Sequence, residues 1–232
     1  MRPFTKTSLI ILPQAATTNS LLLRLIGFVV TAWSYVDGQI GASLSKLLGT
    51  NAEIGATMYS AIISAPAKVA VMKAVAAFVL TSDELDGFNG LLYLTRSVAE
   101  RRNKVAHDMW AWSDDEPKGI IRIPQHTWEK WHANIQAKEN ADPRERIDPL
   151  DPANRLDNST LEVWEEKDFT DLIDDLYHLY HLFDLFWWSW SENRSLSDAQ
   201  RGVMHRMLWS DSHFQTAVAH IRNKGKNTQA AS

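Results

Sequence analysis

The sequence predicts an all-α fold, a helical bundle of about five long helices with a short hairpin and loop excursion after the helix that ends near residue 109. Two observations indicate this class: apolar residues recur at helical spacing over long stretches, and helix start and stop signals flank those stretches. Hydrophobic residues make up 45% of the 232-residue chain and charged residues 22%. Both values are ordinary for globular proteins, and the chain is long enough to bury a sizeable core.

The first helix is expected over residues 20–48. Ser20 suits an N-cap, and Gly49 is a typical C-terminal signal. Nine apolar residues between them follow helical spacing and would form one buried stripe: Leu21, Leu25, Phe28, Ala32, Tyr35, Val36, Ile40, Leu44 and Leu47. The uninterrupted apolar run, residues 25–33, is shorter than the roughly 20 residues of a membrane-spanning helix. A soluble chain without membrane contact is therefore expected.

Three more helices are expected before residue 110. A shorter one should cover residues 52–64. Pro66 suits the first turn of the next, because its φ is already fixed and its missing N–H is not needed there. Thr81 and Glu84 match a capping box that would open a helix over residues 83–109.

The pattern changes after residue 112. The segment SDDEPKG indicates a turn, IIRI a short strand and HTWEKWHANIQAK a short helix, so a minor hairpin is expected there. Residues 139–158 contain three Asp-Pro pairs, which disfavour α geometry and predict a surface loop. Helical spacing resumes over residues 168–190, where FWWSW is expected to lie in the core or at a dimer interface, and again over 197–221.

These elements predict one helical domain over residues 20–221, with a loop excursion at 113–158. Residues 1–19 are expected to form an N-terminal extension and residues 222–232 a flexible tail. The formal net charge is −4, whereas proteins that coat nucleic acid are usually basic, so any nucleic-acid contact should be a local patch. The chain has no cysteine, which excludes disulfides, thiolate zinc sites and cysteine nucleophiles and suits a reducing cytoplasm.

Positive charge gathers in one place, at the end of the helix over residues 83–109. Four cations precede a histidine, His107, within the sequence RSVAERRNKVAHDMW: Arg96, Arg101, Arg102 and Lys104. Asn103 and His107 are i, i+4 neighbours, so Asn103 could hold the imidazole in one tautomer. Arg102 and His107 lie about 140° apart on an ideal helix. They would meet only if the helix end unwinds or if two chains bring their motifs together.

These side chains suit one class of reaction. A histidine can move a proton at neutral pH, and an arginine offers a fork of donors to a phosphate oxygen. Together they fit metal-free attack of an RNA 2′-hydroxyl on the neighbouring phosphate, with arginine stabilising the charge that builds on phosphorus. No carboxylate cluster in this segment suits magnesium, so no metal or cofactor is expected.

The sequence RNKVAH, residues 102–107, resembles the R-x(4–6)-H motif of the HEPN superfamily, in which a polar residue often follows the arginine and alanine often precedes the histidine. The resemblance implies an all-helical, commonly dimeric, metal-independent ribonuclease of toxin–antitoxin or phage-defence systems. It assigns Arg102 and His107 as the catalytic pair and Asn103 as their polar support. Asp108 departs from the pattern, because many members carry glycine or another small residue there.

The resemblance also implies partners. RNA would be the substrate, a second copy of the chain would complete the site, and an antitoxin or regulator protein would be a further partner. Arg101, Lys104 and Arg96 could bind flanking phosphates, and Trp110 could stack on a base at the mouth of the site.

Several alternatives remain open at this point. The motif could be an ordinary helix C-terminus, where basic residues favour the helix dipole, or part of a non-catalytic HEPN-like module that binds RNA, a nucleotide or a partner. Trp110 could pack instead of stacking. The bare arginine-to-histidine spacing recurs from Arg206 to His213, where no chemistry is expected.

Two histidines elsewhere in the chain are candidate metal ligands. His178 and His181 lie three residues apart on one predicted helix, a spacing that can bind a metal ion. No third ligand follows at a suitable spacing, so both are expected to be surface histidines. The sequence suggests no partner for His205 or His213.

Overall fold

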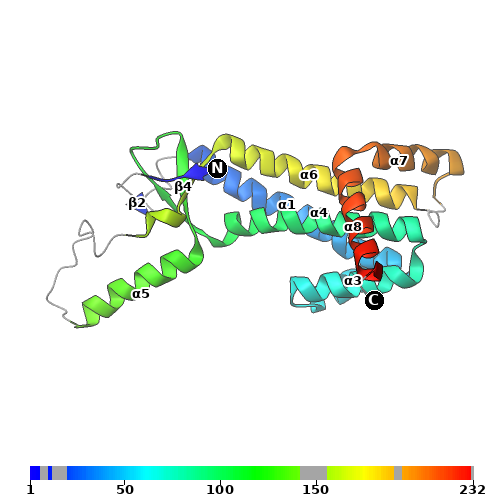
Figure 1. Ribbon diagram of the computed structural model, residues 1–232, viewed down its shortest axis with the longest axis horizontal. Helices are drawn as coiled ribbons and strands as arrows, with labels where there is room; N and C mark the ends of the chain where they lie inside the picture. Colours follow the sequence, from blue (N-terminus) through cyan, green and yellow to red (C-terminus); the bar gives the residue numbers. More distant parts are fainter. Residues whose placement is uncertain (6–9, 12–19, 142–155, 191–194, 231–232) are drawn as a thin grey trace. The chain divides into compact units, whose positions relative to one another are not determined.

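The computed structural model describes residues 1–5, 10–11, 20–141, 156–190 and 195–230 (Figure 1). Within these ranges eight α-helices hold most of the residues, and five short strands form one antiparallel sheet. The predicted all-α class is confirmed, but there are eight helices where about five long ones were expected.

The structure divides into two compact units. Unit 1 comprises Met1–Val30 and Arg101–Ile173, and unit 2 comprises Thr31–Glu100 and Asp174–Ser232. Helices α1, α4 and α6 each have residues in both units, so neither unit is continuous in the sequence. The domain boundaries expected at residues 19/20 and 221/222 remain a prediction.

The first four helices agree closely with the predicted ones: α1 (Ser20–Leu47), α2 (Ala52–Ala61), α3 (Ala65–Val79) and α4 (Ser82–His107). At the starts of α2 and α4, the capping residues form side-chain hydrogen bonds with the backbone. Asn51 accepts from the Ile54 N–H at 2.8 Å to cap α2. The N–H and the hydroxyl of Thr81 both donate to the Glu84 carboxylate, at 2.9 and 2.7 Å, where α4 begins.

The buried stripe of α1 is rotated from the predicted one. Six of the nine expected residues are buried: Leu25, Ala32, Val36, Ile40, Leu44 and Leu47. Phe28 and Tyr35 are 59% and 57% exposed, and Leu21 is also exposed. Leu22 and Val29 are buried in their place. At the edge of an apolar stripe, either of two adjacent residues fits the helical period, so spacing alone does not predict which of the two is buried.

Helix α1 is also long and apolar enough to cross a membrane, judged by length and composition. Only 28% of its most apolar 18-residue window is buried within the chain. The expectation of a soluble chain rested on a run of nine residues, whereas the continuous helix has 28. Core helices and signal sequences pass the same test, so this helix near the N-terminus is weak evidence for a membrane span and solubility is not established.

Four helices follow the hairpin: α5 (Gln125–Ala141), α6 (Glu166–Ser189), α7 (Asp198–Ser210) and α8 (Ser212–Ala230). The single last helix expected over residues 197–221 is wrong, because Asp211 ends one helix and starts another. Its N–H donates to the Leu208 carbonyl at 3.2 Å, and its Oδ1 accepts from the Phe214 N–H at 2.9 Å. Helix α8 then continues to Ala230, so the expected tail is helical up to that residue.

Five strands build the sheet of unit 1: β1 (Arg2–Pro3), β2 (Ile10–Ile11), β3 (Met109–Trp112), β4 (Gly119–Ile123) and β5 (Glu162–Glu165). Their order is β1-β5-β4-β3-β2, and every pairing is antiparallel. The predicted minor hairpin is confirmed as β3–β4, in which Trp110 pairs with Arg122. Strand β5 and the two N-terminal strands were not expected. The excursion at 113–158 contains β4 and α5, and the part of its Asp-Pro loop at 142–155 lies outside the described residues.

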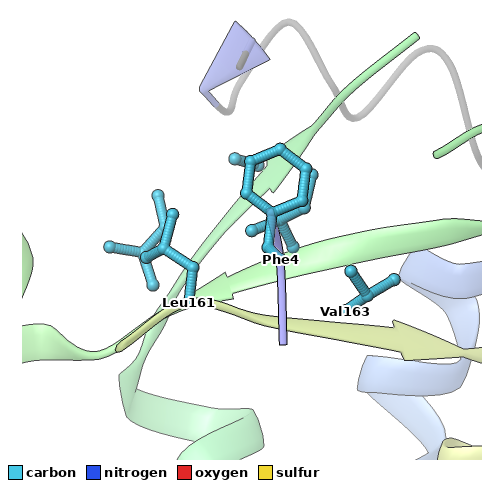
Figure 2. Packing of buried hydrophobic residues seen from close by; sticks show 6 residues of the cluster. Phe4, Leu161 and Val163 are labelled. Carbon is cyan, nitrogen blue, oxygen red and sulfur yellow. The ribbon is translucent and has the colours of Figure 1, made fainter. Parts of the chain in front are cut away.

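One face of this sheet carries an apolar cluster: Phe4, Ala111, Ile121, Ile123, Leu161 and Val163. Figure 2 shows the ring of Phe4 between Leu161 and Val163. Phe4 is 2% exposed, and its N–H donates to the Leu161 carbonyl at 3.0 Å. Phe4 is therefore part of the core of unit 1.

The core of unit 2 contains aromatic side chains from α4 and α6. Phe88 contacts Phe186 and Trp187, with ring centroids 5.7 and 5.9 Å away. The Trp187 Nε1–H donates to the hydroxyl of the fully buried Ser43 at 2.7 Å. The core interpretation of FWWSW is confirmed for Phe186 and Trp187, whereas Trp188 is 45% exposed.

Helices α1 and α2 approach closely at Gly55, which gives a test of the packing in unit 2. A Cβ added to Gly55 would lie 1.9 Å from the Ser45 Oγ, whereas one added to Gly38 on α1 meets nothing within 4 Å. Gly55→Ala should lower the free energy of unfolding by about 1–3 kcal/mol through overpacking. Gly38→Ala should raise it by about 0.5–1 kcal/mol, because alanine favours a helix over glycine. Urea unfolding of both variants measures these changes, and equal effects would contradict the close approach.

Candidate nucleic-acid site at the end of α4

The arginine–histidine motif occupies the last two turns of α4 in unit 1. His107 is the last helical residue, and β3 begins at Met109. The Asp108 N–H donates to the Lys104 carbonyl at 3.2 Å, so the helix ends with its last turn closed. Asn103 and His107 are exposed, and Arg102 is half-buried.

The three residues of the proposed catalytic set are only partly brought together. The Arg102 Nη1–H donates to the Asn103 Oδ1 at 3.2 Å. Within the described part of the chain no hydrogen bond reaches the His107 imidazole, so the hydrogen bond expected from Asn103 is not formed. No hydrogen bond or ion pair joins Arg102 to His107 there either, as their separation on a helix predicts. One chain therefore presents both groups at one helix end without assembling them.

The flanking cations are placed differently from one another. Lys104 Nζ lies 3.9 Å from Glu162 Oε1, and Arg101 is half-buried. Arg96 belongs to unit 2 and forms an exposed ion pair with Glu100, at 2.9 Å. A phosphate bound by Lys104 or Arg96 would have to compete with these carboxylates.

Trp110 is buried, which corrects its assignment as a stacking residue. Its side chain is 5% exposed, and its Nε1–H donates to the Val105 carbonyl at 3.2 Å. Its ring packs edge-on against Trp164, with centroids 5.7 Å apart, and against Phe169. The alternative interpretation, packing, is what the structure shows. The indole packs against the end of α4 and donates to the Val105 carbonyl, one of the last four carbonyls of the helix, which have no partner within it.

Asp108 is held by two groups on its own unit. Its Oδ2 lies 2.8 Å from the Nε of Arg122, and its Oδ1 accepts from the Gln125 N–H at 3.0 Å where α5 begins. Arg122 is 7% exposed, and its Nη1 also contacts the Glu162 carboxylate. The acidic residue that departs from the family pattern is therefore paired with a buried guanidinium and caps a helix.

Arg122 and Glu162 are the residues that sequence reasoning missed around the motif. Arg122 is the charged residue of the strand IIRI, on the face opposite Ile121 and Ile123. An arginine in a buried strand needs carboxylate partners, because an unpaired buried charge is very costly. The sequence therefore indicated that Arg122 needs carboxylate partners, but it did not show which carboxylates they are.

The remaining sequence candidates lie elsewhere. The second arginine-to-histidine match begins at Arg206 on α7 and ends at His213 on α8, so it spans a helix break and shares no context with the first. A pocket of about 250 Å³ lies in unit 2, lined by residues of α4, α6, α7 and α8 and by Trp190. None of the motif residues lines it, and its volume is below the usual range for small-molecule sites.

Comparisons with protein-family models, with curated protein sequences and with solved structures find no match to this chain. The likeness to the HEPN superfamily therefore rests on residues 102–107 and on the helical class.

The buried Arg122 network gives a direct stability test of the support beneath the motif. Arg122→Met should lower the free energy of unfolding by about 3–5 kcal/mol, because it leaves two carboxylates without their buried partner. The matched control Arg96→Met removes an ion pair with 81% and 63% exposed side chains and should cost less than about 1 kcal/mol.

Urea unfolding of these two variants and of Arg122→Lys makes the comparison. The lysine variant should fall between them, because it keeps the charge but loses the guanidinium fork. Equal stability of the two methionine variants would show that Arg122 does not support this region.

Proposed function

We propose that the chain is a metal-independent endoribonuclease of the HEPN type that works as a homodimer in the cytoplasm, in phage defence or toxin–antitoxin growth arrest. The observation that carries this proposal is the placement of Arg102, Asn103 and His107 together at one helix end, with Asn103 and His107 exposed. The biological setting comes from the family likeness alone, which is a weaker warrant than the chemistry of the site.

Each side chain has a role in the proposed reaction. The RNA 2′-hydroxyl gives its proton to His107, and its oxygen attacks the adjacent phosphorus. Arg102 donates to a non-bridging phosphate oxygen and stabilises the charge that develops there. The bond between phosphorus and the 5′-oxygen then breaks, and the His107 imidazolium returns the proton to that oxygen. The products are a 2′,3′-cyclic phosphate end and a 5′-hydroxyl end.

Asn103 has a different role from the one expected from its spacing. Its side-chain oxygen accepts from Arg102 at 3.2 Å, so it holds the guanidinium and not the imidazole. This holds the Nη1 donor of Arg102 in place at the helix end. Arg101 and Lys104 would bind the neighbouring phosphates, Lys104 by leaving Glu162.

A second copy of the chain would complete the site. Arg102 and His107 do not meet within one chain, but a two-fold axis at this helix end would bring the motif of each copy to the other. Helix α1 offers an apolar surface for such a contact in unit 1, because Leu21 and Phe28, two turns apart on one side of the helix, are 40% and 59% exposed. Exposed apolar side chains on one helix face are typical of an interaction surface.

The runner-up is a non-catalytic HEPN-like module that binds RNA, a nucleotide, or an antitoxin or regulator protein. One observation favours it: no hydrogen bond within the described residues holds the His107 imidazole in one tautomer, as a general base requires. A binding module needs only the cations and an accessible surface.

RNA cleavage in excess chelator tests the proposal. Wild type should cleave and leave 2′,3′-cyclic phosphate ends, and His107→Ala should be slower by about 10²–10⁴-fold. Arg102→Ala should lose about 10²–10³-fold. The matched control is Arg206→Ala, an exposed arginine from the second, unsupported match to the bare spacing, and it should keep full activity. Circular dichroism and sedimentation establish that each variant is folded and dimeric.

The other outcomes are equally informative. Equal cleavage by all four proteins would mean a contaminating nuclease and a wrong site. The folded wild-type dimer could instead cleave none of several RNAs, tRNA included, but bind one of them. If the Arg102 and His107 variants then fail to bind that RNA, the chain is a binding module and not an enzyme. Absence of both cleavage and binding would contradict both functions.

A further inference from the structure

Three side chains with metal-ligating atoms meet in unit 2, far along the sequence from the motif. His178 comes from α6, Asp211 from the junction of α7 and α8, and His213 from the first turn of α8. The His178 Nε2 lies 2.8 Å from the Asp211 Oδ2. The two imidazole rings are nearly perpendicular, with centroids 5.3 Å apart. One ligand atom from each residue lies within 4.8 Å of the other two.

We propose that His178, Asp211 and His213 form a binding site for a divalent transition-metal ion of the zinc class. Two imidazoles and one carboxylate are the protein ligands of many zinc sites, and a fourth position is then left for water or an exogenous ligand. The same donors also bind Co²⁺ and Ni²⁺, whereas Mg²⁺ and Ca²⁺ prefer sites made of oxygen alone.

Asp211 is oriented for this role by its two oxygens. Oδ1 accepts from the Phe214 N–H at 2.9 Å, which caps α8 and fixes the plane of the carboxylate. Oδ2 is the oxygen that faces His178. A backbone hydrogen bond on the far oxygen is the kind of outer contact that orients metal ligands.

The site is accessible and needs only a small adjustment. The side chains of His178 and Asp211 are 35% and 21% exposed, and His213 is exposed. Ligand atoms around a tetrahedral zinc ion lie about 3.4 Å apart, given zinc–ligand distances near 2.1 Å. Turning the His213 side chain so that its ligand atom moves by little more than 1 Å would shorten the 4.8 Å separation between ligand atoms to this tetrahedral distance. The metal would replace the His178–Asp211 hydrogen bond and join α6 to the α7–α8 junction.

Titration with Co²⁺ tests the site, using untagged protein so that no added histidines bind the ion. Wild type should bind one Co²⁺ per chain, with the intense visible absorption of a four- or five-coordinate ion, and Zn²⁺ should displace it. Zn²⁺ should also raise the melting temperature, because the ion binds the folded chain in preference to the unfolded one. His178→Gln and His213→Gln should each weaken binding by more than about 100-fold, since even outer contacts change metal affinity 10–100-fold.

His205→Gln is the matched control, because it removes another exposed histidine from α7 and should leave the affinity unchanged. His213 is exposed, so its variant should keep the metal-free melting temperature of wild type. Unaltered Co²⁺ affinity in both ligand variants, or no saturable binding by wild type, would overturn the proposal. The titration measures only metal binding, so its result does not depend on whether the chain cleaves RNA.

Discussion

The structure around the candidate site depends on one buried guanidinium, that of Arg122. It lies on β4 at 7% exposure and contacts Asp108 at the end of α4 and Glu162 on β5. A charge removed from water must be paired, so these three elements cannot separate without exposing or orphaning a charge. Asp108 extends the network to the start of α5 through the Gln125 N–H. The end of α4 is thereby fixed against the sheet of unit 1.

The Arg122 network fixes the end of α4 but leaves the side chains of Asn103 and His107 exposed to solvent. Val105 and Trp110 face the core, and the Trp110 indole satisfies the carbonyl of Val105. Asn103 and His107 face solvent on the same two turns. The backbone of this helix end is fixed against the sheet, while Asn103 and His107 remain accessible to a ligand.

Local signals in the sequence predicted much of the fold. Apolar spacing and caps located α1 to α4 and α6, because helices are stabilised by neighbours along the chain. Strands β1 and β2 are two residues long, and Phe4 is buried only because Leu161 and Val163 meet it from far along the chain. No periodicity can signal such contacts. The α7–α8 break was missed because one aspartate, Asp211, ends the first helix and caps the second.

The same distinction holds for the sites. The cluster of cations before His107 was visible because it is continuous in the sequence. The Arg122–Glu162 pair spans 40 residues and the His178–Asp211 pair spans 33, so only the tertiary structure brings them together. Trp110 was ambiguous for another reason, since an aromatic side chain beside a basic motif suits stacking and packing equally well in sequence.

The central claim is that the catalytic set is completed between two chains. Mixing His107→Ala with Arg102→Ala under conditions that exchange subunits tests it directly, because the mixed dimer keeps one Arg102 and one His107 on different chains. We expect RNA cleavage in excess chelator, which each variant alone lacks, to return in the mixture. If subunits exchange and wild type is active, but the mixture stays as inactive as its parts, the site does not form across the dimer.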